Sequence, residues 1–280
     1  MKSELIYLIS NFILTCYGLL IKSYKDVELI EQIYIRTLVF TLLSLALLKF
    51  NVLFSSTTIW LGIINFISIY GIYVAFEKLG IGITQALFYS WPLLFYIISD
   101  KQFNFGDLSI LVITFLFVLL IYKPINNENE KNKDNQKYIG LLGVFASIIT
   151  HVYILNYYKL YKPPIEEYLY NQYAFILIVF SIYFLWKYFK NKKTIHDKIQ
   201  SNYKTFSYIL VFNLLLGYLG FYLQFFSVGQ LQPYIISLLT FISIIISLFI
   251  DKLVFQQIIT NEQWMGIIGI ITMTALFRKD

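Results

Sequence analysis

No charged side chain occurs between Lys204 and Asp251, a run of about 46 residues that reads TFSYILVFNLLLGYLGFYLQFFSVGQLQPYIISLLTFISIIISLFI. One α-helix rises about 1.5 Å per residue and needs about 20 residues to cross the roughly 30 Å hydrocarbon core of a bilayer. The run is therefore long enough for two crossings. Gly229 and Pro233 lie near its middle, where they supply the backbone freedom and the helix stop that a tight reversal requires. We predict two membrane helices joined by a short turn.

The composition of the whole chain indicates an integral membrane protein. Of the 280 residues, 58% are hydrophobic and only 14% are charged, which leaves too little polar surface for a soluble body of this length. The net charge of +6 comes from lysines in loops between apolar segments, so we expect a lipid bilayer as partner and no nucleic acid. The single cysteine, Cys16, excludes an internal disulfide and a multi-cysteine metal site.

Hydropathy along the chain predicts ten crossings. A polar segment, 123–137, is rich in Asn, Glu and Lys and cannot be buried in lipid, so it divides the crossings into five and five. We assign residues 1–125 to a first five-helix repeat, 126–137 to a polar linker and 138–280 to a second five-helix repeat. The predicted crossings are 5–21, 33–48, 57–76, 83–99, 108–122, 138–158, 168–186, 206–228, 233–250 and 263–277.

The two halves also resemble each other in sequence. The segment Tyr70–Gly80 can be laid over Leu219–Gly229, which matches glycine, tyrosine, phenylalanine and glycine in register. Because each half has an odd number of crossings, the repeats run in opposite orientations, as in many alternating-access transporters. We predict an all-α integral membrane protein of ten transmembrane helices, built as two inverted five-helix repeats around a central cavity. The first, third, fourth, sixth, eighth and ninth crossings are expected to line this cavity, with the other four outside.

Two segments carry a resemblance to a known family. One is Tyr73–Gly80 (YVAFEKLG), followed by Pro92 in the next crossing, and the other is Gln257–Gly266 (QIITNEQWMG) before the last crossing. Arg36 lies near the start of the second crossing, as an arginine often does in that family. On these residues the chain resembles the EamA-like ten-helix family of the drug/metabolite transporter (DMT) superfamily over essentially its whole length. The resemblance implies transport of amino acids or related metabolites, with both termini in the cytoplasm.

Function is expected on polar side chains inside the crossings, because in hydrocarbon such groups need protein partners or water. Carboxamides are costly in lipid and are relieved by a cavity, while tyrosines offer rings and hydroxyls to an organic ligand. Helix packing is the alternative role, above all for serine and glycine. The candidate substrate-binding residues are Asn11, Tyr17, Tyr73, Gln85, Tyr89, His151, Asn213, Tyr222, Gln224 and Ser237.

Arg36 and His151 each have two interpretations. Arg36 can anchor a carboxylate or phosphate, but it lies near the Glu31 end of its helix, where a long side chain can also snorkel to the headgroups. His151 can bind substrate or carry a proton near neutral pH, or it can satisfy an interhelical hydrogen bond. The crossings lack the dense cluster of Lys and Arg that phosphates require, so the cavity suits a small neutral or zwitterionic solute.

We predict a transporter of small organic metabolites that works by alternating access. Amino acids or related zwitterions are the first choice of substrate, and S-adenosylmethionine or a nucleoside-type metabolite is the second. No Asp or Glu lies deep inside a predicted helix, so a facilitator or exchanger fits better than proton coupling. We expect no cofactor and no metal.

Two other classes of membrane protein are alternatives to a transporter. A membrane-embedded enzyme is disfavoured, because the chain has no His-Glu-x-x-His, no Gly-x-Ser-x-Gly and no pair of intramembrane aspartates. A non-transporting membrane scaffold stays open. We expect a multi-pass monomer or homodimer in the cell (inner) membrane. Its orientation also stays open: cytoplasmic termini would place the lysine-rich loops near 123–137 and 187–204 outside, against the positive-inside rule.

Overall fold

The computed structural model describes residues 2–23, 27–79, 84, 87–99, 104–121, 134–190, 203–255 and 260–277. These residues are helical apart from short turns and include no strand, which confirms the all-α prediction. Helical residues 203–212 lead directly into a short π-helix, η1. The other elements, in chain order, are α1 (Lys2–Ser23), α2 (Leu29–Leu47), α3 (Ser56–Leu79), α5 (Trp91–Ser99), α6 (Phe105–Ile121), α7 (Asp134–Tyr161), α8 (Ile165–Lys190), η1 (Asn213–Tyr218), α10 (Leu219–Val228), α11 (Pro233–Phe255) and α12 (Asn261–Phe277).

Local sequence sets where these helices begin and end. A capping box opens α2, in which the Glu28 N–H donates to Glu31 Oε2 at 2.9 Å. After α2 the chain turns through Lys49, whose φ of 52° ends the helix in the left-handed region. The reversal predicted inside the uncharged run is confirmed, because α10 ends at Val228 and α11 begins at Pro233.

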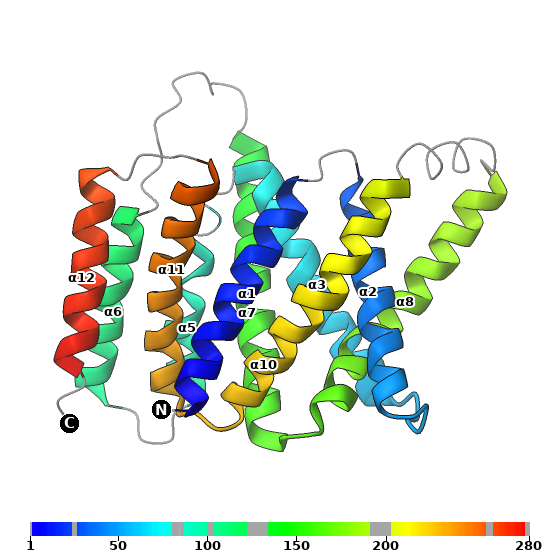
Figure 1. The fold of residues 1–280 in the computed structure, drawn as a ribbon, viewed down its shortest axis with the longest axis horizontal. Helices are drawn as coiled ribbons and strands as arrows, with labels where there is room; N and C mark the ends of the chain where they lie inside the picture. Colours follow the sequence, from blue (N-terminus) through cyan, green and yellow to red (C-terminus); the bar gives the residue numbers. More distant parts are fainter. Residues whose placement is uncertain are drawn as a thin grey trace.

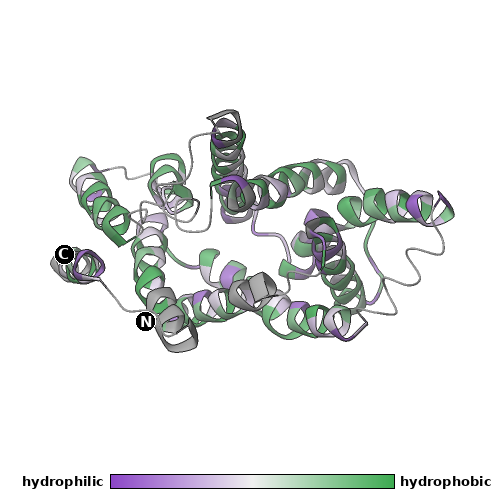
Figure 2. Ribbon diagram, turned by 90° about the horizontal axis from the view of Figure 1, so that it is seen from above, coloured by the Kyte–Doolittle hydropathy of each residue, from purple (hydrophilic) through white to green (hydrophobic). Residues whose placement is uncertain are grey.

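Among the described residues, five helices are long and apolar enough to cross a bilayer, which makes the structure compatible with a multi-pass membrane protein. They are Ile30–Leu47, Ser56–Ala75, Lys137–Tyr161, Ile165–Lys190 and Tyr203–Val228, and shorter apolar helices are formed by Phe105–Ile121 and Pro233–Ile246. Large hydrophobic side chains such as Leu142 and Ile149 stand exposed on the helix surfaces. Figure 2 shows the same pattern from above, with hydrophobic residues spread over most helices. Hydrocarbon is the solvent that such surfaces suit.

The helices pack in pairs that join distant parts of the chain. Helix α3 packs along α7, α1 along α10, α2 against α8, and α6 against α12. The pair α6 and α12 forms one edge of the molecule and α8 forms the other, while α1 begins and α12 ends at the same face (Figure 1). Helix α11 packs against both α1 and α5 and so connects the α6–α12 edge to the rest.

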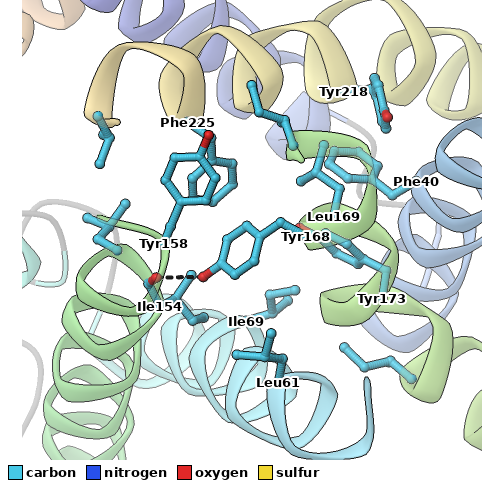
Figure 3. Close-up of a cluster of buried hydrophobic side chains, with 14 of the residues drawn as sticks. Phe40, Leu61, Ile69, Ile154, Tyr158, Tyr168, Leu169, Tyr173, Tyr218 and Phe225 are labelled. Carbon is cyan, nitrogen blue, oxygen red and sulfur yellow. Dashed lines mark hydrogen bonds between the residues drawn. The ribbon is translucent and has the colours of Figure 1, made fainter. Parts of the chain in front are cut away.

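Two buried apolar clusters hold this arrangement together. The larger cluster centres on Tyr168 of α8, which is fully buried and donates its hydroxyl to the Ile154 carbonyl at 2.5 Å (Figure 3). The rings of Tyr158 and Phe225 each lie 5.0 Å from the Tyr168 ring, so α7, α8 and α10 meet there. The smaller cluster joins α5, α6, α11 and α12 through the fully buried side chains Tyr96, Leu111, Phe241 and Ile270.

Candidate functional site

Arg36 lies on α2 seven residues after the helix begins at Leu29, a rise of about 10 Å. Its guanidinium donates to the Tyr173 hydroxyl of α8 twice, from Nε at 3.2 Å and from Nη2 at 2.7 Å. The same group lies 4.7 Å from the centre of the Phe221 ring and 5.4 Å from that of Phe40. The side chain is thus directed across the bundle, so the snorkelling interpretation does not describe it.

The guanidinium keeps a full charge without a carboxylate beside it. In the described part of the chain Arg36 forms no ion pair, and its partners are tyrosine hydroxyls and three aromatic faces. The residue is half-buried. Cation–π contacts and a neutral acceptor stabilise a guanidinium only in part, and its remaining N–H groups can bind a carboxylate with two parallel hydrogen bonds.

Tyr17 and Asn213 form a buried pair next to Arg36. The Tyr17 hydroxyl donates to Asn213 Oδ1 at 2.5 Å and lies beside the guanidinium. Asn213 Nδ2 donates in turn to the Ile209 carbonyl at 2.8 Å, so the carboxamide is held by its own helix. Gly217 gives the Tyr17 ring its place, since a Cβ at that glycine would lie 3.0 Å from the ring. An alanine at position 217 would therefore bring its Cβ too close to the Tyr17 ring.

Tyr73 and His151 complete the surroundings of Arg36. Tyr73 of α3 is half-buried and lies within electrostatic range of both Arg36 and Tyr173. His151 of α7 is also within electrostatic range of Arg36, and its ring contacts aromatic neighbours on the segment before α5 and at its start. We call Arg36, Tyr17, Tyr73, Tyr173 and Asn213 the Arg36 cluster. It draws on α1, α2, α3, α8 and η1, and thus on both halves of the chain.

A second polar group, the carboxamide cluster, consists of Tyr7, Asn11, Gln224 and Thr240. The Tyr7 hydroxyl is hydrogen-bonded to Thr240 Oγ1 at 2.8 Å, and the carboxamides of Asn11 and Gln224 lie beside it. Asn11 Nδ2 and Gln224 Oε1 are buried without a protein partner. An unpaired donor and an unpaired acceptor in one place are costly for a protein interior, so this cluster suits a ligand or water that can both donate and accept. Within α1, Asn11 of this cluster lies about 9 Å along the helix axis from Tyr17.

Three other candidate residues have different surroundings. Ser237 is fully buried and donates to the carbonyls of Pro92 at 2.8 Å and Pro233 at 3.0 Å, so its hydroxyl joins α11 to α5. Tyr89 is half-buried against the smaller apolar cluster. Gln85 lies outside the described residues.

Tyr222 leads to a residue that the sequence did not single out. Its hydroxyl donates to Glu166 Oε1 at 3.0 Å. The seventh crossing was predicted to begin at residue 168, whereas α8 begins at Ile165, after a turn in which the Pro164 carbonyl accepts the Tyr168 N–H at 2.9 Å. Glutamates are favoured in the first helical turn, where they face the positive end of the helix dipole. That preference is the signal that could have moved the boundary and brought Glu166 into the helix.

The second and seventh crossings were predicted to lie outside the central cavity. The corresponding helices, α2 and α8, contribute Arg36 and Tyr173 to the Arg36 cluster. Both helices are apolar around most of their circumference, so one or two polar residues distinguish their faces. In the described ranges, no group of three or more His, Cys, Asp and Glu side chains is placed to hold a metal ion.

Comparisons with known proteins bear on the fold. No family model matches the chain, and no curated protein matches it. Among solved structures 19 chains match, and one of these crystal structures aligns over 100% of this chain and 99% of its own length, with a TM-score of 0.70 and 11% sequence identity. A likeness at that identity shows the fold alone. The fold defines the class: a helical bundle with several apolar helices, compatible with a multi-pass membrane protein.

Proposed function

We propose that the chain is a transporter built from two inverted five-helix repeats, and that it carries small organic metabolites by alternating access. The packing of the helices supports the repeat. In the proposed repeat, α1 corresponds to α7, α3 to α10 and α5 to α11. Under this correspondence the α3–α7 contact is equivalent to the α1–α10 contact, and the α1–α11 contact is equivalent to the α5–α7 contact. The α2–α8 and α6–α12 contacts map onto themselves. In Figure 1, α1 and α7 run in opposite directions.

Close glycine contacts follow the same correspondence. A Cβ at Gly71 of α3 would lie 2.6 Å from the carbonyl oxygen of Gly143 on α7. A Cβ at Gly220 of α10 would lie 2.8 Å from the Leu14 side chain on α1. Gly71 and Gly220 are aligned in the comparison of the two halves, so equivalent glycines allow the equivalent helix pairs to approach closely.

The observation that carries the functional proposal is the unpaired interior cation. Arg36 projects from α2 of the first half onto Tyr173 and Phe221 of the second half, with no carboxylate partner in the described ranges. A charge at such a place is expensive and is retained where it binds something. We infer that it binds the carboxylate of an amino acid or related zwitterion, with Tyr17 and Tyr73 as further polar contacts. The carrier then acts as a facilitator or an exchanger.

The aromatic rings around Arg36 favour one alternative substrate. Phe40, Phe221 and Tyr173 present flat faces within 5.5 Å of the guanidinium, and a purine ring can stack on such faces. A nucleoside-type metabolite that also carries a carboxylate, such as S-adenosylmethionine, is therefore the second candidate.

Counterflow in proteoliposomes tests both candidates. Vesicles are loaded with a mixed amino-acid pool, and uptake of labelled neutral, aromatic and sulfur-containing amino acids and of S-adenosylmethionine is measured one solute at a time. We expect exchange of at least one of these solutes, and its loss in Arg36→Met. The matched control is Lys187→Met, which removes a cation from an exposed 3.7 Å pair with Glu28. Exchange of a sugar phosphate without any amino acid contradicts the substrate class, and no exchange of any solute favours a scaffold.

A further inference from the structure

Glu166 provides a carboxylate within the bundle that the proposed transport mechanism has not used. It lies in the first turn of α8, where it is half-buried and accepts a hydrogen bond from the Tyr222 hydroxyl of α10 at 3.0 Å. In the described part of the chain it forms no ion pair. The nearby end of α7 carries Lys159, whose Nζ donates to the carbonyls of Val228 and Leu231. Among the described residues, the hydrogen-bond partner of Glu166 is thus the neutral hydroxyl of Tyr222.

Three tyrosines lie near this carboxylate, and one of them, Tyr222, contacts it directly. Besides Tyr222, both Tyr158 of α7 and Tyr218 of η1 lie within electrostatic range of Glu166. The rings of Tyr218 and Tyr222 are stacked, with centroids 6.4 Å apart and planes inclined by 29°. The Tyr158 ring packs against the Phe225 ring, with centroids 5.1 Å apart (Figure 3). A carboxylate among aromatic faces is the arrangement by which proteins recognise organic ammonium groups.

We propose that Glu166, Tyr158, Tyr218 and Tyr222, the tyrosine cage, form a binding site for the ammonium group of an organic cation. The carboxylate supplies the opposite charge and the ring faces supply cation–π attraction, while the hydrogen bond from Tyr222 fixes the carboxylate orientation. None of this requires a metal or a second protein chain. The proposal rests on the proposed function for the route by which the cation arrives and for the carboxylate site at Arg36.

The position of the cage relative to Arg36 defines the substrate further. Glu166 and Tyr173 are seven residues apart on α8, so they share one face of that helix with an axial rise of about 10 Å between them. Tyr173 is the residue that holds the Arg36 guanidinium. A carboxylate on Arg36 and an ammonium in the cage must therefore lie at opposite ends of an extended molecule. The two charges on the α-carbon of an amino acid are too close together, whereas the side-chain ammonium of a basic amino acid is suitable.

Binding to the purified, full-length protein tests the cage without any transport step. The probes are lysine and norleucine, which have the same straight chain with and without the terminal ammonium, and intrinsic fluorescence reports their dissociation constants. We expect the wild type to bind lysine about tenfold more tightly than norleucine. Glu166→Gln should abolish this preference and leave norleucine affinity unchanged, which also shows that the variant is folded. Glu166→Asp should restore part of the preference, and Tyr222→Phe should weaken it less than Glu166→Gln.

The outcomes separate the cage from the proposed function. An unchanged lysine-to-norleucine ratio in Glu166→Gln, no preference in the wild type, or no binding of either probe overturns the cage. If norleucine binding is lost in Arg36→Met while Glu166→Gln behaves as wild type, the carboxylate site at Arg36 is supported and the tyrosine cage is contradicted. If Glu166→Gln removes the lysine preference but counterflow shows no exchange of any solute, the tyrosine cage is supported and the proposed transport function is contradicted.

Discussion

Replacing Arg36 with methionine removes the feature on which the proposed function most depends. The change deletes the charge, two hydrogen bonds to the Tyr173 hydroxyl at 3.2 and 2.7 Å, and three cation–π contacts. A hydrogen bond between a charged donor and a substrate carboxylate contributes roughly 1.5–3 kcal/mol. Since about 1.36 kcal/mol corresponds to a factor of ten, the KM for a carboxylate-bearing substrate should rise about 10- to 150-fold.

The same change should not weaken the fold. Arg36 has no carboxylate partner in the described ranges, so its removal leaves no opposite charge buried, and an apolar side chain of similar length suits the neighbouring Phe40 and Phe221 rings. We expect thermal stability in detergent to be unchanged or higher. Arg36→Lys keeps the charge but loses the planar guanidinium, so it should fall between the wild type and Arg36→Met in KM.

Two measurements on the same preparations check this reasoning. Initial counterflow rates over a range of substrate concentrations give KM, and a thermal unfolding curve gives stability. The control variant Lys187→Met should match the wild type in both. If Arg36→Met transports with the wild-type KM, the arginine does not contact the substrate. If it instead unfolds at a much lower temperature, the arginine is a structural residue, and the proposed carboxylate site is wrong.

Three further predictions concern other parts of the bundle. Gln224→Leu removes a buried acceptor that has no protein partner. We expect protein abundance to be unchanged and the transport rate to fall about 5- to 30-fold. A wild-type transport rate would show that Gln224 does not contact the substrate. Gly71→Val would place side-chain atoms 2.6 Å from a backbone oxygen of α7 and should lower the midpoint of thermal unfolding, whereas Gly106→Ala, which meets only a flexible side chain, should not. Single cysteines at Asn129 and Asn191, in a background without the native cysteine, should react with an impermeant maleimide from the same side of the membrane; labelling from opposite sides would contradict ten crossings.

The helical segments could be predicted well from the sequence because their signals are local. An uncharged run of more than twice the length of one crossing has to fold back, and Gly229 with Pro233 marks where it does so. The first residue of α8 was harder to predict from the sequence. A hydropathy window excludes Glu166 from the crossing, although a glutamate in the first turn is favourable there.

The contacts of the candidate residues depend on geometry that the sequence expresses only weakly. Arg36 carried two interpretations, because a position near the end of a helix is compatible with headgroups and with the interior alike. Only the packing of α2 against α8 places its guanidinium on Tyr173. Asn213 and Gln224 were both predicted as substrate-binding candidates, and the structure assigns them to different clusters, beside Tyr17 and beside Tyr7 respectively. The π-helix between them was not foreseen.

The π-helix η1 (Asn213–Tyr218) has a consequence for how the proposed repeat can be traced in the sequence. Each of its turns closes over five residues where an α-helix closes over four, so this segment contains more residues per unit length than α3, which has no such turn in its described range. An insertion in one copy of a duplicated gene leaves this kind of trace. An alignment of the halves that matches Gly71 with Gly220 holds downstream of η1, and it must admit a gap to continue upstream. If the proposed repeat is correct, searches for internal duplication that forbid gaps within helices will underestimate the similarity of the two halves.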